Sequence, residues 1–286
     1  MKVIRSLKQM SAFSRSVHLK KQTIGFVPTM GALHAGHLSL IRAARRENHK
    51  AVVSVFVNPI QFAPQEDYKK YPRDFKLDAR LCSKEGADVI FYPDSRRMYP
   101  DNYKTYVVVR DLSDCLCGKS RPGHFKGVAT VVAKLLNIVN PDIAYFGQKD
   151  AQQAFIIKKM AQDLNMPVKI KIMPTVRDKD GLALSSRNIY LSRSERRDAV
   201  ILSQALNLAK EMVRQGKKKS TQIIGRMRRL ISAKKSVSIQ YISIVDLENL
   251  RPLDKIKDKA LIALAVYIGK TRLIDNIIVN RNLQFR

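Results

Sequence analysis

The spacing of hydrophobic residues changes repeatedly along the first 176 residues. Five short apolar or alternating runs, rich in β-branched residues and bounded by Gly, Pro or Asn, predict largely buried strands at 23–27, 51–57, 87–92, 143–147 and 168–173. Between them, apolar residues recur at helical spacing, as at 38–48 and 128–139. Strands that alternate with helices predict right-handed crossovers, and hence an α/β fold with a Rossmann-like, doubly wound parallel sheet. Ligands are expected at the carboxyl ends of its strands.

The pattern changes after Val176. A loop of mixed charge leads into helical patterns at 194–215 and 221–233, and alternating runs follow at 239–246 and 259–269. These two runs predict strands of a small antiparallel sheet. We therefore expect two domains, a Rossmann-like domain at 1–175 that binds the ligands and a smaller C-terminal α+β domain at 176–286.

Net charge is the most unusual property of the composition. The 286 residues include 53 Lys and Arg but only 24 Asp and Glu, giving +29, which first suggests a nucleic-acid partner. However, 45% of the residues are hydrophobic, which predicts a folded core, and we find no aromatic-rich RNA-binding strand or zinc knuckle. Ten Lys or Arg but only Glu211 occur at 210–235. We interpret this excess as a solvated basic face and expect no nucleic-acid partner.

The cysteines indicate a reducing compartment, and neither a membrane span nor an export signal is recognisable. Cys82, Cys115 and Cys117 are odd in number and only the last two are close together, which supports neither a disulfide framework nor a four-ligand zinc site. The longest apolar runs are shorter than the roughly 20 residues that cross a bilayer. The first residues, MKVIRSLKQM, lack the apolar segment of an export signal. We therefore expect a cytoplasmic protein with no membrane partner.

The segment PTMGALHAGH at 28–37 carries the clearest candidate chemistry. Gly31 and Gly36 let the backbone turn sharply and approach a ligand closely. His34 and His37 are three residues apart, so both project from one face at the amino end of the predicted helix. That end favours bound phosphate and a neutral imidazole that can donate its N–H. The alternative is a structural turn with two polar caps.

A Gly/Thr-rich turn followed by HxGH resembles the nucleotide-binding signature of class I aminoacyl-tRNA synthetases and related nucleotidyl transferases. A larger set of motifs in order resembles the pantothenate synthetase family, the pantoate–β-alanine ligases, over about residues 1–280. These motifs are PTMGALHAGH, FVNPIQF, YPRDFKLD, MYP, RPGHFKGVATVVAKLLNIVNPDIAYFGQKDAQQ and PTVRDKDGLALSSRNIYLS. The resemblance implies that ATP and pantoate form an enzyme-bound pantoyl adenylate and pyrophosphate. The amine of β-alanine then attacks the acyl carbon and releases AMP. It also implies a homodimer whose C-terminal domain acts as a lid.

The resemblance also implies which residues act on ATP. His37 is the expected proton donor, with His34 and Lys149 as further catalytic residues; on sequence alone, Lys149 could equally form a solvated ion pair with Asp150. In GLALSSRN, two hydroxyls and a guanidinium could hold polyphosphate. The expected ATP-binding residues are Met30, Gly31, Ala32, Leu33, His34, Ala35, Gly36, His37, Gly147, Gln148, Lys149, Asp150, Val176, Leu184, Ser185, Ser186 and Arg187.

Pantoate and β-alanine are expected to contact amide side chains. By the resemblance, Gln61 and Gln153 bind pantoate and Gln61 also faces β-alanine, with Asn58 in the same wall. An amide can accept from a hydroxyl and donate to a carboxylate, which suits a small hydroxy acid; without the resemblance, either Gln would be interpreted as a surface residue. Mg²⁺ should accompany ATP, held mainly by phosphates and water, and Asp78 is the candidate protein ligand.

Two departures from the family pattern stand beside the expected pocket. Gln148 occupies a position where Glu is usual, and Ala151 one where an aromatic residue is usual. Arg121 and His124 match a family loop beside the entrance of the active site, and no chemical step is assigned to them.

A different enzyme is also compatible with HxGH alone. A nucleotidyl transferase acting on a phosphorylated alcohol would transfer the nucleotide to its product, whereas a ligase releases AMP. Gln61, Gln153 and GLALSSRN favour the ligase.

Overall fold

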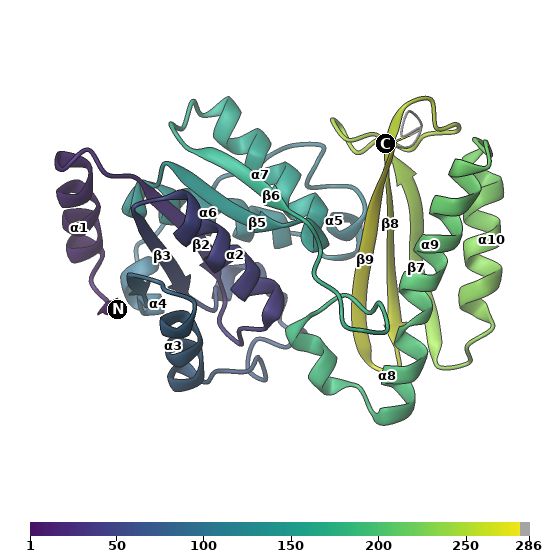
Figure 1. Cartoon of the computed structure of the whole chain (residues 1–286), viewed down its shortest axis with the longest axis horizontal. Coiled ribbons are helices and arrows are strands. Elements are labelled where there is room, and N and C mark those ends of the chain that lie inside the picture. Colours follow the sequence, from purple (N-terminus) through teal and green to yellow (C-terminus); the bar gives the residue numbers. More distant parts are fainter. Residues whose placement is uncertain (281–286) are drawn as a thin grey trace. The chain divides into compact units, whose positions relative to one another are not determined.

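A computed structural model of the chain describes residues 1–280 and divides into two compact units, each described by itself (Figure 1). The first unit comprises Met1–Asp114, Gly118–Gln148 and Gln153–Pro174. The second comprises Cys115–Cys117, Lys149–Gln152 and the described part of Thr175–Arg286. Two short segments from earlier in the chain, one of them carrying Lys149, therefore belong to the second unit.

The first unit is built on a parallel sheet of six strands, which confirms the predicted Rossmann-like α/β fold. All five predicted strands form, and a sixth, which the sequence did not predict, pairs with β4 at one edge of the sheet. The strand at the other edge is half-exposed rather than buried as expected, because an edge strand has a neighbour on one side only. In sheet order, the strands are β1 (Lys2–Ile4), β4 (Val89–Phe91), β3 (Lys50–Val55), β2 (Ile24–Thr29), β5 (Ile143–Gly147) and β6 (Lys169–Met173).

The order of the strands reverses between β2 and β5. The chain runs from β2 through β3 to β4 on one side of this point and from β5 to β6 on the other. Right-handed crossovers then place the connecting helices on opposite faces of the sheet, and a ligand crevice is expected at the carboxyl ends of β2 and β5. The helices of this part are α1 (Leu7–Leu19), α2 (Ala35–Glu47), α3 (Phe75–Lys84), α4 (Ser95–Met98), α6 (His124–Val139) and α7 (Ala151–Asp163), with the short α5 (Cys117–Ser120) before α6.

The second unit contains an antiparallel sheet covered by helices, the α+β arrangement that the sequence predicts. The sheet has a third strand, β9, which the sequence analysis did not predict. Its order is β7 (Val237–Val245), β8 (Lys259–Ile268), β9 (Thr271–Asn280), and the helices are α8 (Arg193–Ala199), α9 (Ile201–Arg214) and α10 (Ser220–Ser232).

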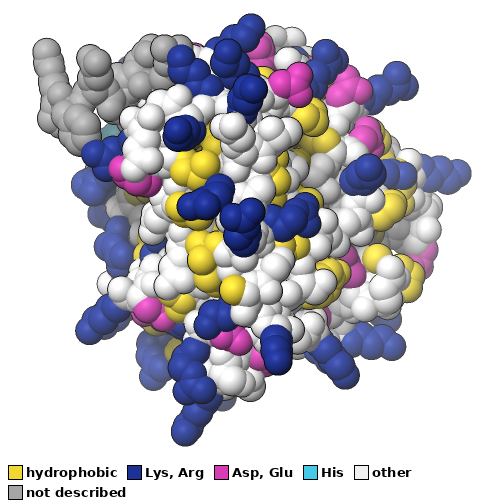
Figure 2. Space-filling view, turned by 90° about the vertical axis from the view of Figure 1, so that its right-hand side faces the viewer, with side chains coloured by type: hydrophobic (Ala, Val, Ile, Leu, Met, Phe, Trp, Pro, Cys, Tyr) yellow, Lys and Arg dark blue, Asp and Glu magenta, His cyan; other side chains and the backbone are white. Residues whose placement is uncertain are grey.

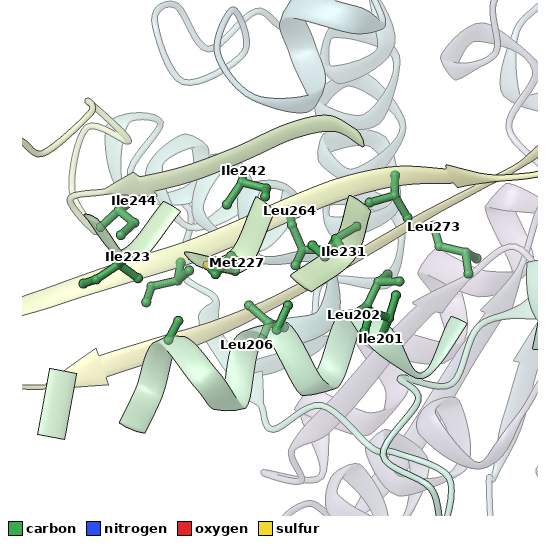
Figure 3. Close-up of a cluster of buried hydrophobic side chains, with 14 of the residues drawn as sticks. Ile201, Leu202, Leu206, Ile223, Met227, Ile231, Ile242, Ile244, Leu264 and Leu273 are labelled. Carbon is green, nitrogen blue, oxygen red and sulfur yellow. The ribbon is translucent and has the colours of Figure 1, made fainter. Parts of the chain in front are cut away.

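Apolar side chains from α9, α10 and the sheet form the core of the second unit (Figure 3). Leu206 of α9, Met227 of α10 and Leu264 of β8 are at most 1% exposed and lie in this cluster. Apolar residues at helical spacing on α9 and α10 therefore explain how the helices cover one face of the sheet.

The outer face of α10 is basic. Ile223, Met227 and Ile231 point into the core, whereas Arg226, Arg228 and Arg229 are exposed. Figure 2 shows that Lys and Arg side chains are spread over this side of the molecule and outnumber the Asp and Glu side chains between them. The basic residues at 210–235 thus lie on α9, on α10 and in the segments that follow these helices, and all of them except the half-buried Lys218 are exposed.

Two further features bear on the protein's environment. In the part of the chain that the structure describes, Cys82, Cys115 and Cys117 form no disulfide. Burial raises the pKa of the Cys82 thiol to about 12. None of the helices within residues 1–280 is both long and apolar enough to span a bilayer.

Candidate functional site

The turn that follows β2 is held by hydrogen bonds to its main chain. The Thr29 hydroxyl donates to the carbonyl of Ser54 at 2.7 Å and accepts from the Gly31 N–H at 3.1 Å. Gly31 has φ +82°, and a Cβ there would lie 2.8 Å from a carboxylate oxygen of Asp78. Glycine is therefore required both by the left-handed backbone and by the close approach of Asp78.

Asp78 of α3 closes this turn from the other side. Its two carboxylate oxygens accept hydrogen bonds from the N–H groups of Ala32 and Leu33 at 3.0 and 2.9 Å, and Ala32 has φ +50°. Burial raises the pKa of Asp78, and this outweighs the two backbone hydrogen bonds, which lower it. The carboxylate thus supports the loop that precedes HAGH.

His34 and His37 form the amino end of α2. His34 is the N-cap; its Nδ1 accepts from the N–H of Gly36 at 3.2 Å, and Nδ1 of His37 accepts from the N–H of His34 at 3.4 Å. Because each Nδ1 accepts a hydrogen bond, each neutral ring carries its proton on Nε2. The ring centroids are 4.1 Å apart. The helix end therefore presents two imidazole N–H donors where the backbone already favours phosphate.

Gln61 lies in a buried wall of amide groups at the end of the 3₁₀ turn η1 (Pro59–Gln61). Asn58 donates through Nδ2 to Oε1 of Gln61 at 3.0 Å and to the carbonyl of Gly127 at 3.1 Å, while its Oδ1 accepts from the Tyr99 hydroxyl at 2.8 Å. Nε2 of Gln61 donates to the sulfur of Met30 at 3.1 Å. A thioether is a weak acceptor, so a substrate carboxylate or hydroxyl can replace it.

A charged network lies behind Gln61. Arg121 donates to both oxygens of Glu66 at 2.6 and 2.7 Å and to Nε2 of His124 at 2.9 Å. Since a guanidinium can only donate, His124 must carry its proton on Nδ1, which donates to the main-chain carbonyl of Gln61 at 2.8 Å. Burial raises the pKa of Glu66, but the hydrogen bonds and the charge of Arg121 lower it by more. The pKa of Glu66 is therefore below its usual value. A pocket of about 350 Å³ is lined by these residues.

In the second unit, Lys149 and Asp150 lie in the 3₁₀ turn η2 (Gln148–Asp150), which follows β5 in the chain. The Lys149 side chain is 18% exposed and its ammonium is 3.6 Å from a carboxylate oxygen of Asp150, which is 48% exposed. The Lys149 side chain is therefore more buried than in a solvated ion pair at the surface. Asn276 of β9 donates through Nδ2 to the main-chain carbonyl of Lys149 at 2.9 Å.

The loop that contains the other expected ATP-binding residues forms a hairpin in the same unit. The N–H of Leu184 donates to the carbonyl of Val176 at 3.1 Å, and Arg177 pairs with Ala183 in the hairpin. Ser185 then caps the 3₁₀ helix η3 (Ser186–Tyr190). Val176 and the 184–187 segment are thus joined at the two ends of one hairpin.

The expected site residues fall into these two groups. The first unit links the 30–37 segment with Gln61, and places Gln153 half-buried on the first turn of α7. The second unit holds Lys149, Asp150, Val176 and 184–187.

A resident metal centre does not fit the described residues. No group of three or more His, Cys, Asp or Glu side chains within residues 1–280 could hold an ion, and both oxygens of Asp78 accept backbone hydrogen bonds. The donor set suits instead a Mg²⁺ ion that arrives bound to ATP.

Sequence reasoning missed the residues that support the site. Tyr99 and Glu66 have no local signal, because each is far along the chain from its partner. Asn276 lies on the strand that was not predicted. The motif strings MYP and RPGHF include Tyr99, Arg121 and His124, but they assign no role to these residues.

Comparisons with known proteins agree with this geometry. The family model described as pantoate-beta-alanine ligase matches residues 2–278. Relatives named pantothenate synthetase include that of Caldicellulosiruptor bescii, 53% identical over 98% of this chain and 99% of the relative, and that of Thermotoga petrophila, 52% identical over 98% and 100%.

Solved structures are also similar. Pantothenate synthetase from Thermus thermophilus has a TM-score of 0.92 at 43% identity, covering 97% of this chain and 99% of that one. Pantoate-beta-alanine ligase from Francisella tularensis, complexed with beta-gamma ATP and beta-alanine, has a TM-score of 0.80 at 36% identity over 97% of each chain.

Proposed function

The chain belongs to the pantoate–β-alanine ligase family, and from this premise we propose how its residues condense pantoate with β-alanine at the expense of ATP. The reaction proceeds in two halves. Pantoate first attacks the α-phosphate of ATP to give pantoyl adenylate and pyrophosphate; the amine of β-alanine then attacks the acyl carbon and AMP leaves. The observation that carries this proposal is the pair of imidazole N–H donors at the amino end of α2.

The first half requires negative charge to be stabilised on phosphate. His34 and His37 each present Nε2–H, because Nδ1 is committed to the cap. Donors that are fixed before the reaction stabilise developing charge without reorganisation. His37 serves as the proton donor to the phosphate oxygens, and the N–H groups at the helix end add to the same field.

Lys149 supplies a positive charge to the phosphates. Its long side chain is mostly buried, and its only ion pair among the described residues is the long one with half-exposed Asp150. The Ser185, Ser186 and Arg187 segment offers hydroxyl and guanidinium donors for the polyphosphate. Support for this assignment comes from the motif and from the hairpin that places the segment beside Val176.

Pantoate binds to the amide wall. Gln61 is 8% exposed and its Nε2 donates to a sulfur, which is a weak acceptor, so a pantoate oxygen can take that place. Gln153 is the second pantoate contact, and the Gln61 face also receives β-alanine. Asn58, held by the Tyr99 hydroxyl, keeps the Gln61 amide in one orientation.

Mg²⁺ enters with ATP. The ion would be held mainly by the phosphates and water, where it neutralises charge on the leaving pyrophosphate. Asp78 remains the candidate protein ligand, because each of its carboxylate oxygens has a second lone pair besides the one that accepts from Ala32 or Leu33.

Assembly and location complete the proposal. We expect a homodimer in the cytoplasm, with the C-terminal domain at 176–286 as a lid over the 1–175 domain. A sedimentation experiment tests the dimer.

The experiment that tests the mechanism is a three-substrate assay. Protein with ATP and pantoate alone should exchange radiolabel between pyrophosphate and ATP, and AMP release should require β-alanine as well. Transfer of AMP to a product, or no exchange by folded protein, would contradict the adenylate mechanism.

Substitutions test the catalytic roles of His37 and Lys149. His37→Ala and Lys149→Ala should each lower turnover by about 100-fold or more, because each removes a donor to the transition state. His49→Ala and Lys159→Ala are matched controls, since both side chains are exposed and lie outside the site; they should keep normal turnover. If either site variant behaves like its control, its assignment is wrong.

A further inference from the structure

Strand β9 contacts each of the expected ATP-binding segments of the second unit. Asn276 donates to the main-chain carbonyl of Lys149 at 2.9 Å. The neighbouring Asp275 accepts two hydrogen bonds from Arg177, at 2.6 and 2.9 Å, and Arg177 directly follows Val176. The 3₁₀ helix η3, which begins at Ser186, also packs against β9. One strand thus joins segments that are far apart in the sequence.

The two polar residues are unusual for a buried strand. The Asp275 side chain is 1% exposed and Asn276 is 4% exposed. Burying a charge or an amide is costly unless every polar atom is paired. Apolar residues at these positions would extend the core at lower cost, so core stability alone does not explain this pair.

The contacts of Asp275 and Asn276 form one network. The N–H of Asn276 donates to Oδ1 of Asp275 at 2.8 Å, and the same oxygen accepts from Nη2 of Arg177. Nη1 of Arg177 also donates to the carbonyl of Gly181, at the tip of the hairpin, at 3.0 Å. Three consecutive hydrogen bonds therefore link the Lys149 turn to Arg177 in the hairpin.

The hairpin also has contacts that do not involve Asp275. Arg196 of α8 holds it from the outside by donating to Asp180 at 2.6 Å and to Asp178 at 2.8 Å. What the Arg177 contact adds is the location of the hairpin on β9. The contacts of Arg196 thus support the shape of the hairpin, and the contact of Arg177 with Asp275 sets its position on β9.

We propose that Asp275 and Asn276 are positioning residues that align Lys149 with the 184–187 segment for ATP. Asn276 binds Lys149 by its carbonyl, so the ammonium stays available for phosphate while the main chain beneath it is fixed. The inference rests on the proposed function, since it takes Lys149 and 184–187 as contacts of ATP. A displacement of about 1 Å in such a group costs about 100-fold in rate.

Asn276→Ala in the full-length protein tests the proposal. With ATP varied at saturating pantoate and β-alanine, kcat/KM for ATP should fall about tenfold or more, because the Lys149 carbonyl loses its partner and the turn can move. The KM values for pantoate and β-alanine should stay within about twofold, since their contacts lie in the other unit. A purely structural role would lower the folded fraction and leave every KM unchanged.

Asn48→Ala is the matched control. Asn48 is also a buried amide, 7% exposed, and donates to a main-chain carbonyl, that of Ala44, at 3.0 Å. It lies at the carboxyl end of α2, away from the helix end that carries His34 and His37. This variant should lose thermal stability and keep the native KM for ATP.

Arg177→Lys supplies a second, independent variant. The Arg177 side chain is 27% exposed, and lysine keeps the charge opposite Asp275 but loses the two parallel hydrogen bonds. It should also raise the KM for ATP, and it decides the matter if Asn276→Ala does not fold. Native kcat/KM for ATP in the folded variants would overturn the inference.

Lys149→Ala in the same assay distinguishes failure of the positioning role from failure of the proposed function. If Lys149→Ala loses turnover while Asn276→Ala and Arg177→Lys remain normal, the positioning role is wrong and the proposed function stands. If Lys149→Ala itself remains near normal, the proposed ATP contact of Lys149 is wrong, and this inference falls with it.

Discussion

Gly127 of α6 allows the helix to pack directly on the turn that carries Gln61. A Cβ at this position would lie 2.4 Å from the carbonyl oxygen of Ile60 and 2.6 and 2.7 Å from Cα and N of Gln61. All three are main-chain atoms, which cannot rotate away as a side chain can. The substitution Gly127→Ala must therefore separate the helix from the turn.

The size of the separation follows from these distances. Ordinary contact for a Cβ begins at 3.4 Å, so the 2.4 Å approach requires a shift of about 1 Å. Overpacking of this kind costs about 1–3 kcal/mol, while Ala in place of Gly in a helix returns about 0.5–1 kcal/mol. The net loss of stability is then about 0–2.5 kcal/mol. A 1 Å displacement of a substrate-binding group costs about 100-fold in rate, so activity should fall more than stability.

Steady-state kinetics with pantoate varied, together with thermal unfolding, measure both effects. Gly127→Ala should lower kcat/KM for pantoate by about 10- to 100-fold while most of the protein stays folded. Gly225→Ala on α10 is the control, because nothing lies within 4 Å of its Cβ; it should stabilise the protein by about 0.5–1 kcal/mol and leave the kinetics unchanged. Native pantoate kinetics in Gly127→Ala, or a loss that matches the unfolded fraction, would refute the reasoning.

Three further outcomes are expected. Asp78→Asn should raise the KM for ATP about tenfold, because its amide nitrogen would face a backbone N–H of the 32–33 turn; an Mg²⁺ titration of the same variant tests the ligand role, which an unchanged Mg²⁺ dependence would contradict. The folded-state pKa of Glu66 is lowered, so its pairing with Arg121 stabilises the fold above the unfolded-state pKa of about 4.3 and is lost as pH falls through the folded value. The difference in melting temperature between the native protein and Glu66→Gln should therefore shrink below about pH 4, and a constant difference would contradict the pairing. Finally, fluorescence titration with RNA at physiological salt should show no binding tighter than micromolar, because the basic face of α10 carries no base-stacking residues.

The sequence predicts the central strands and the HAGH helix end well, because the signals are local. The strands next to β2 are apolar runs, interrupted only by Ser54 in the predicted 51–57 strand, and His34 and His37 are close enough to share one helix turn. β1 was missed because only Ile4 of its three residues is buried. β9 was missed because Asp275 and Asn276 interrupt its apolar alternation.

The supporting contacts could not be predicted, because they join distant parts of the chain. Glu66 and Arg121 are 55 residues apart, and Asp78 and Leu33 are 45 apart. Either carboxylate, taken alone, is an ordinary polar residue on a surface loop or helix, and for Asp78 the sequence suggests a metal ligand rather than a loop support. Only the parallel sheet, which brings the segments after β2, β3 and β4 to one edge, makes them neighbours.

The two supporting networks share a physical principle that explains why the sequence does not show which residue each of them holds. His124 binds Gln61, and Asn276 binds Lys149, in each case through the main-chain carbonyl. A carbonyl is present at every position, so the residue being held gives no sign of its partner. Holding the main chain also leaves the amide of Gln61 and the ammonium of Lys149 able to exchange their partners for substrate. Removing the partner of each carbonyl should therefore change the KM for one substrate only. His124→Ala should change the KM for pantoate and leave that for ATP unchanged. Asn276→Ala should change the KM for ATP and leave that for pantoate unchanged.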